Sequence, residues 1–284
     1  MPQRHSLLES FSLTAEGVRS GRQVTVTVAP APAGSGLVLT ATETGAVWPL
    51  DLAHTLALPG CTAAGTAQSH VAYIEHFLAA CSALSLTDAA ICVVGPELPL
   101  LDGSAQPWLE RLLAAGLQEF SVEVAPLIVT EPVIVGRRGA QLTALPAPET
   151  RLAFTLESPH PLIGRQTATY RPGTDDFATL VAPARTFTTV EEATYAREHG
   201  LMRGGSEENA IVIYPDHLSA EPQLEQAFAY HKLLDLTGDL YVLGRPVQAR
   251  ISGFNSGHTL NHLFAEALAR HAETGEAVLD EEAP

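Results

Sequence analysis

Basic residues are scarce in this chain of 284 residues. Lysine and arginine total 16 against 32 aspartate and glutamate residues, and the formal net charge is −16 at pH 7. A surface this acidic repels the phosphates of nucleic acids and of anionic membranes. We therefore expect no nucleic-acid partner.

Long hydrophobic runs are also missing. Hydrophobic residues make up 46% of the chain, yet no stretch reaches the roughly 18 apolar residues of a transmembrane helix. The first residues, MPQRHSLLESFSL, lack the apolar centre of a secretory signal. We expect a cytoplasmic protein without a membrane span, and a disordered acidic tail over residues 273–284.

Cysteine is rare, and its spacing is uninformative. Cys61, Cys81 and Cys92 are odd in number and form no CxxC pair, which argues against a disulfide framework and against a cysteine-ligated zinc. Cys81 and Cys92 lie among apolar residues, so we expect both in the core. Cys61 lies in the loop PGCTAAGTAQ and receives no role.

The chain contains enough periodic segments to predict an α+β protein. The alternation QVTVTV, the turn PAPAGSG and the run LVLTA predict a β-hairpin, and residues 70–86 predict an apolar helix. The segment DGSAQPW predicts a helix capped by Ser104 and anchored by Trp108. Further on, DLYVL and VQARISGF predict strands, and a last helix opens at Ser256 and Gly257.

The two halves of the chain resemble each other in order. Each has a β-rich start, a long helix, one or two strands, a Gly-Ser loop and a closing helix. We predict two similar α+β domains, residues 1–122 and 123–284, with the active site in the cleft between them.

Two helical segments far apart in the sequence carry metal-binding residue types. His231 and Asp235 are spaced i, i+4, so they lie on one face of a helix. With His76 they make three ligands and leave a fourth position open, as in a catalytic zinc site. Glu75, beside a ligand, is placed to move protons. The pattern indicates a zinc hydrolase, although an isolated HxxxD is more often a surface pair or a core histidine.

Six strings occur in order and strengthen this interpretation: IEHFLAA, GPELPLLDGSAQPW, ARTF, GLMRGGSEENAIV, HKLLDLTGDLYVLG and SGHTLN. Together they closely resemble the UDP-3-O-acyl-N-acetylglucosamine deacetylases, the zinc enzymes of lipid A synthesis. The resemblance runs from about Ser12 to about Ala269. It implies two βααβ-type domains with helices packed between two sheets, and an insert in the second domain over about residues 187–214.

The resemblance also implies a role for each matching residue. The zinc ligands are His76, His231 and Asp235; Glu75 is the general base, His258 the general acid or electrostatic partner, and Asp239 the group that orients His258. Lys232 and Thr186 contact the reacting group, and Phe187 borders the site. The expected substrate contacts include positions where this chain departs from the family; they are Phe187, Leu201, Met202, Glu157, Ser158, Asn255, Gly257 and Arg19.

These roles suit amide hydrolysis. Zinc lowers the pKa of bound water to about 7, and Glu75 would take the proton as that water attacks the acetyl carbonyl. Thr186 would stabilise the oxyanion, an effect often worth about 3 kcal/mol per donor. The same ligand set also suits Fe²⁺. We expect a monomer that acts on a small acylated amino sugar.

The chain departs from the family pattern at its nucleotide-facing positions. Glu157 and Ser158 replace an Asp-Phe pair whose ring stacks on uracil, and Asn255 replaces a lysine that faces the diphosphate. Tyr230 replaces an arginine, and Arg19 stands where GLHSG has its histidine. We expect a diverged member that binds the UDP group weakly or differently. The alternatives are a deacetylase of a non-UDP amino sugar and a catalytically idle, zinc-holding sugar- or lipid-binding protein.

Overall fold

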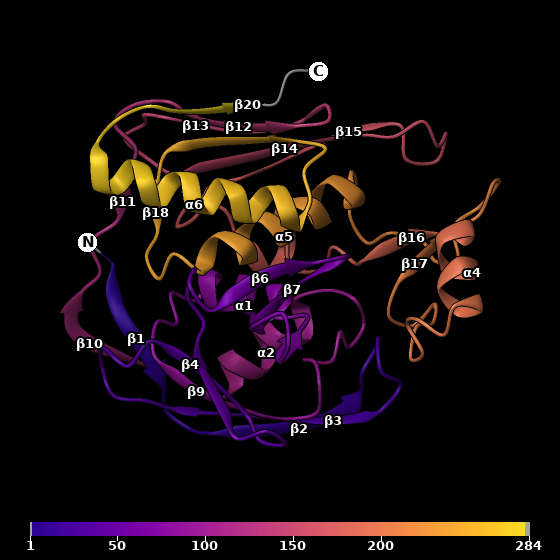
Figure 1. The fold of residues 1–284 in the computed structure, drawn as a ribbon, viewed down its shortest axis with the longest axis horizontal. Helices are drawn as coiled ribbons and strands as arrows, with labels where there is room; N and C mark the ends of the chain where they lie inside the picture. The colour runs from indigo at the N-terminus through magenta and orange to yellow at the C-terminus, as the bar shows by residue number, and fades with distance from the viewer. Residues whose placement is uncertain (1, 282–284) are drawn as a thin grey trace.

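Two β-sheets enclose a layer of helices. The computed structural model describes residues 2–281. In Figure 1 one sheet lies below and the other above, with α1, α2, α5 and α6 between them, while α4, β16 and β17 project to one side. The predicted α+β class and the packing of helices between two sheets are confirmed.

The lower sheet comes from the first half of the chain. Its strand order is β2-β3-β9-β4-β5. Alternation of side chains places Val24, Val26 and Val28 of β3 on the buried face. The strands are β2 Phe11–Glu16, β3 Gln23–Pro30, β9 Ala89–Val94, β4 Leu37–Ala41 and β5 Ala46–Pro49.

The upper sheet comes from the second half, in the order β15-β14-β19-β13-β12-β20. Its strands are β15 Arg165–Tyr170, β14 Arg151–Glu157, β19 Arg250–Phe254, β13 Ala140–Leu145, β12 Val133–Arg137 and β20 Val278–Glu281.

The two sheets share one topology. In each, a late strand enters between two hairpins: β9 is antiparallel to β3 and parallel to β4, and β19 is antiparallel to β13 and parallel to β14. The similarity of the two halves that the sequence suggests therefore appears in their strand order. We propose that each half is a domain; the predicted boundary after residue 122 falls at the end of β10.

Six helices occur within residues 2–281: α1 Glu75–Ala83, α2 Gln106–Ala114, α3 Phe177–Leu180, α4 Val190–Glu198, α5 Ala227–Tyr241 and α6 His258–Thr274. None is long and apolar enough to cross a bilayer.

Short strands complete the fold. The pairs are β1 Gln3–Leu7 with β10 Leu117–Glu123, β11 Leu127–Ile128 with β18 Val247–Gln248, and β16 Phe187–Thr189 with β17 Ile211–Ile213. A three-stranded sheet contains β6 Thr55–Leu58, β7 Cys61–Gly65 and β8 His70–Ala72.

Three predictions about strands and helices are wrong. The segments QVTVTV and LVLTA do not form a hairpin, because β9 lies between β3 and β4. The helix predicted over residues 70–86 begins only at Glu75, since residues 70–72 pair with β7. The segment DLYVL is the end of α5 rather than a strand: Leu236 and Leu240, one turn apart, are both buried.

Two further expectations need correction. Most of the acidic tail is ordered, because α6 includes residues 273 and 274 and β20 pairs in parallel with β12; residues 282–284 lie outside the described part. Cys92 is exposed, because it faces away from the core on β9, whereas Cys81 is buried.

Close packing of α1 on α5 joins the two halves. Gly238 of α5 faces the backbone of α1, and a methyl group there would collide with the carbonyl oxygen of Glu75. Glycine is therefore required at this crossing by space, although it weakens the helix. The contact lies next to Glu75 and His76, so it sets how far these side chains stand from His231 and Asp235.

Replacement of Gly238 by alanine should destabilise the protein. Helix propensity alone predicts a gain of roughly 1 kcal/mol, but overpacking typically costs about 1–3 kcal/mol. We expect Gly238→Ala to lower the melting temperature and to weaken metal retention in equilibrium dialysis. An unchanged or raised melting temperature with full metal retention would contradict this role of Gly238.

Candidate active site

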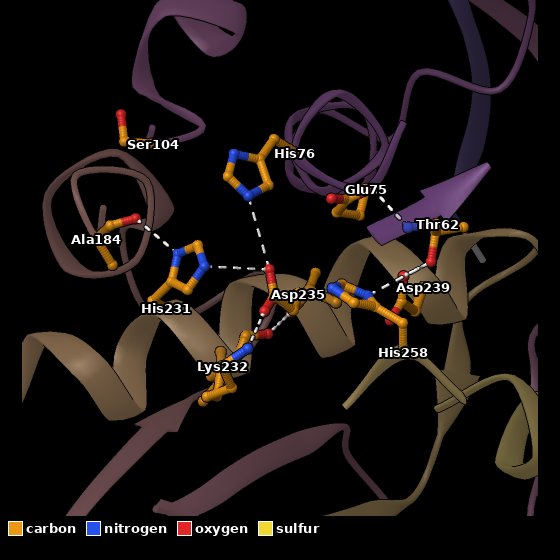
Figure 2. A network of polar contacts seen from close by, with 12 residues as sticks. Thr62, Glu75, His76, Ser104, Ala184, His231, Lys232, Asp235, Asp239 and His258 are labelled. Carbon is orange, nitrogen blue, oxygen red and sulfur yellow. Dashed lines mark hydrogen bonds and ion pairs between the residues drawn. The ribbon is translucent and has the colours of Figure 1, made fainter. Parts of the chain in front are cut away.

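Three predicted ligand residues meet between α1 and α5. His76 lies in the first turn of α1, and His231 and Asp235 lie one turn apart on α5. The Nε2 atoms of His76 and His231 lie 3.6 and 3.5 Å from Oδ1 of Asp235. One ligand atom from each residue lies within 4.8 Å of the others, and all three residues are buried. Figure 2 shows the three side chains pointing to one place.

The ligand histidine on α5 has a defined tautomer. Nδ1 of His231 lies 3.2 Å from the carbonyl oxygen of Ala184, which can only accept, so Nδ1 carries the hydrogen. The lone pair of Nε2 then faces Asp235, as in metal sites whose histidines are oriented from behind. Burial lowers the pKa of His231 to about 3, so the ring is neutral.

Lys232 holds the carboxylate ligand from the other side. Its Nζ donates to Oδ2 of Asp235 at 2.7 Å, which leaves Oδ1 for the two histidines. The ammonium also lies 5.7 Å from the centre of the Phe187 ring, and this ring contacts His231 edge-on at 5.8 Å. Phe187 therefore borders the site, as the resemblance implies.

Glu75 is a buried carboxylate beside the metal-binding residues. Its Oε2 accepts a hydrogen bond from the backbone N–H of Thr62 at 3.0 Å. Burial raises the pKa of Glu75 to about 7, against the opposing effects of His258 and His76. A carboxyl group with a pKa near neutrality is suited to exchange protons.

His258 and Asp239 form a second charged pair. Nδ1 of His258 donates to Oδ2 of Asp239 at 2.8 Å, and Nδ2 of Asn261 donates to the same oxygen at 2.8 Å. Burial alone would lower the pKa of His258, but the Asp239 carboxylate outweighs burial and raises it to about 9. The imidazole is therefore protonated at neutral pH.

Thr62, to which the sequence assigns no role, connects Glu75 with the His258–Asp239 pair. Its hydroxyl donates to Oδ1 of Asp239 at 2.6 Å, while its backbone N–H holds Glu75. The sequence offers no signal for this role, because Asp239 lies 177 positions further along the chain. The neighbouring Cys61 is buried, and burial raises its pKa to about 12.

These residues open onto a cleft of about 470 Å³. Glu75, Thr186, Phe187, Lys232, Gly257 and His258 line it together with the three ligand residues. No hydrogen-bond partner for the Thr186 hydroxyl occurs within residues 2–281, while its backbone N–H donates to Gly103 at 2.7 Å. Leu58, Pro59, Gly60, Tyr73, Leu100, Thr259 and Leu260 complete the wall.

Arg185, in the ARTF string, joins this wall to the DGSA loop. Its guanidinium donates to the carbonyl oxygens of Asp102, Glu207 and Glu208 at 2.7, 2.9 and 2.7 Å. These bonds fix Arg185 and with it the adjacent residues Ala184 and Thr186. In α2, which follows this loop, Trp108 is buried as predicted. The residue at the helix cap is Ala105 rather than Ser104, whose hydroxyl accepts from the backbone of Gln106.

Several predicted substrate contacts lie outside the cleft wall. Asn255 is engaged with the backbone of Glu157, donating to its carbonyl at 3.1 Å and accepting from its N–H at 2.7 Å. Ser158 accepts from the N–H of His160. The side chains of Arg19 and Leu201 are exposed, and Met202 packs against Tyr73.

Two further histidines of α6, His262 and His271, are buried. His262, one turn beyond His258 on α6, places Nε2 3.5 Å from the Thr62 hydroxyl. His271 accepts from the backbone of Thr130 at 3.0 Å and contacts the carbonyl of Glu276. Neither belongs to the group of His76, His231 and Asp235 that could hold a metal.

An open three-ligand site, a buried carboxylate and a charged histidine–aspartate pair define a metal-dependent hydrolase. A model of the LpxC family, described as UDP-3-O-acyl N-acetylglycosamine deacetylase, matches residues 4–270. This chain belongs to that family.

Curated relatives carry the corresponding name, UDP-3-O-acyl-N-acetylglucosamine deacetylase. One from Thermosynechococcus vestitus is 40% identical over 69% of this chain and 69% of its own length. One from Synechocystis is 33% identical over 93% of this chain and 98% of its own, and one from Leptospira biflexa is 31% identical over 93% and 89%.

Loss of the Asp239 charge should move the alkaline limit of activity. His258 keeps its proton below a pKa of about 9, so we expect the rate to fall as the pH rises through that value. In Asp239→Asn the largest raising effect is lost and burial is opposed only by the smaller effects of Asp235 and Glu75, so the limit should fall well below pH 9. The stability gained from the His258–Asp239 pair should likewise be full below about pH 6.5 and lost as the pH rises through about 9.

The matched control is Thr62→Val, which removes one hydrogen bond from Asp239 and keeps its charge. Its alkaline limit should stay near that of the wild type even if the rate falls. The measurement is the pH profile of kcat. The assignment fails if Asp239→Asn leaves the alkaline limit in place.

Proposed function

We propose that this protein removes the N-acetyl group of UDP-3-O-acyl-N-acetylglucosamine, with Zn²⁺ held by His76, His231 and Asp235. The observation that carries the proposal is the convergence of these ligands beside Glu75 and the His258–Asp239 pair in one cleft. The family and the printed names of the relatives support the same activity.

The residues present fit a zinc ion. Tetrahedral bonds of 2.0–2.1 Å place neighbouring ligand atoms roughly 3.3 Å apart, close to the 3.5 and 3.6 Å separations from Oδ1 of Asp235. Two neutral imidazoles and one carboxylate also suit Fe²⁺. When bound, the ion supplies a Lewis acid and lowers the pKa of water at the open position.

Glu75 acts as the general base in this proposal. Its Oε2 is held by the backbone of Thr62, so Oε1 is the oxygen free to take a proton from the attacking water. The Thr186 hydroxyl lines the cleft without another partner among the described residues, and it can donate to the oxygen of the former carbonyl. A donor of this kind often contributes about 3 kcal/mol.

His258 acts on the leaving group. Protonated at neutral pH, it stabilises the negative charge that develops and donates its proton to the departing amine, which leaves as the C–N bond breaks. The proton that Glu75 takes from water then passes to His258 or to solvent, so both residues return to their starting protonation states. Asp239 keeps the ring in place throughout, because its Oδ2 accepts from Nδ1.

Apolar side chains provide a wall for the acyl group. Leu58, Tyr73 and Leu100, which pack together, line the cleft, and so does Phe187. No atom lies within 4 Å of a Cβ built on Gly257, so this glycine leaves room beside His258 where an amino sugar can sit. We propose that Leu201 and Met202 of the insert lie along the outer path of the chain. Monomeric state remains a prediction.

The proposal is tested by acetate release from UDP-3-O-acyl-N-acetylglucosamine by the zinc-loaded protein. Glu75→Gln should lower kcat by at least about 100-fold, as expected for loss of a general base, with zinc content unchanged. Asp235→Ala should lose zinc as well as activity. The exposed Glu110 provides the control, since Glu110→Gln should behave as the wild type. Absence of acetate release by the zinc-loaded wild type would refute the proposal.

A second candidate, deacetylation of an amino sugar without the nucleotide, is favoured by the state of Asn255. Its amide makes two hydrogen bonds to the Glu157 backbone, and among residues 2–281 the cationic side chain that lines the cleft, Lys232, is paired with Asp235. If the nucleotide contributes little, removing it should change kcat/KM by less than about tenfold, which is 1.4 kcal/mol. A loss of kcat/KM larger than tenfold on removal of the nucleotide, together with competitive inhibition by free UDP, would favour the nucleotide substrate.

A further inference from the structure

A small apolar cluster lies directly behind one wall of the cleft. It contains six buried residues, Val18, Cys61, Ala63, Ala72, Tyr73 and Leu100, with Leu56, Leu58 and Met202 packed against them. Only Leu58, Tyr73 and Leu100 of this cluster also line the cleft. The apolar wall of the cleft therefore continues into a filled region.

Tyr73 stands between the cleft and the rest of this cluster. Its side chain is 6% exposed, and its hydroxyl contacts the sulfur of Met202 at 3.2 Å. A thioether is a weak acceptor, so the hydroxyl is poorly paired for a buried group. The tyrosine therefore occupies this position mainly by filling space.

The backbone at this contact is strained on both sides. Tyr73 has φ +61° and Met202 has φ +47°, values that residues with a side chain rarely adopt. Such conformations persist where surrounding structure holds them, and they concentrate at functional sites. Tyr73 also lies only two positions before Glu75, so its ring is anchored next to the reacting group.

The insert is fastened to the first half beside this contact. The backbone N–H groups of Arg203 and Gly204 donate to the carbonyls of Arg19 and Val18 at 3.2 and 3.0 Å. A side chain on Gly204 would collide with the carbonyl oxygen of Gly17. These contacts hold Met202 against Tyr73, so the ring has little freedom to move aside.

We propose that Tyr73 is a specificity-determining residue that limits the length of the O-acyl chain. The inference rests on the proposed function, which places the acyl chain against Leu58, Tyr73 and Leu100. A chain that grows beyond this wall meets the ring and Met202, and its further methylene groups stay in water. Methylene groups beyond this point therefore add nothing to binding.

The size of the effect follows from hydrophobic burial. Each methylene that enters an apolar environment improves binding by about fourfold. Chains that end before Tyr73 gain this factor for each added methylene, and chains that extend past it gain nothing. With the ring removed, the longer chains should gain it as well.

The experiment compares kcat/KM for UDP-N-acetylglucosamine carrying butanoyl, octanoyl or tetradecanoyl groups at O3. Tyr73→Ala and Tyr73→Leu shorten the side chain, and Tyr73→Phe is the matched control, which keeps the ring and removes the hydroxyl. All three variants keep a Cβ, so the backbone strain is the same. Thermal melting and zinc content confirm that each variant folds.

In the wild type and Tyr73→Phe, the gain in kcat/KM from butanoyl to octanoyl should not continue, and the octanoyl and tetradecanoyl substrates should agree within about threefold. Tyr73→Ala, or Tyr73→Leu where alanine prevents folding, should raise the tetradecanoyl-to-butanoyl ratio by about tenfold or more. The proposal is overturned if the wild type has a kcat/KM at least about tenfold higher for the tetradecanoyl than for the octanoyl substrate. It is also overturned if the tetradecanoyl-to-butanoyl ratio is unchanged in the shortened variants. If the wild type deacetylates none of the three substrates, the proposed function fails instead.

Discussion

The packing of α1 against α5 is the contact on which the site depends. Gly238 allows the two helices to approach until a methyl group would strike the Glu75 carbonyl. This approach brings His76 from the first half within reach of His231 and Asp235 from the second. Separation of the helices by even a side chain would pull one ligand away from the other two, because interiors are close-packed and deform little. The two sheets outside hold the helices in this arrangement (Figure 1).

Burial and charge divide the work among residues of similar chemistry. His231 and His258 are both buried histidines, yet the first is neutral with a pKa of about 3 and the second is protonated with a pKa of about 9. Hydrogen-bond partners account for the difference: Nδ1 of His231 meets a carbonyl, whereas Nδ1 of His258 meets the Asp239 carboxylate. In the proposed mechanism the neutral ring binds the metal and the protonated ring donates a proton.

Much of the fold and site could be predicted because the signals are local or specific. The helix that carries His231 and Asp235 and the repeated order of elements follow from short patterns. The roles proposed for the site residues rest on the family strings. The hairpin predicted for residues 23–41 failed because β9, about 50 positions later, pairs with both strands. Likewise DLYVL resembles a strand by composition, but its leucines continue a buried helical face.

The sequence by itself determined the chemistry: which ligand types occur, their i, i+4 spacing on one helix, the adjacent Glu75 and the membership of a family. Only the tertiary structure decided how these groups are tuned. Thr62 reaches Glu75 through its backbone and Asp239 through its hydroxyl, and Tyr73 meets Met202 across the cleft wall. These contacts join residues far apart in the chain, so no local pattern encodes them. They arise when the two halves pack together and remove the polar groups from water.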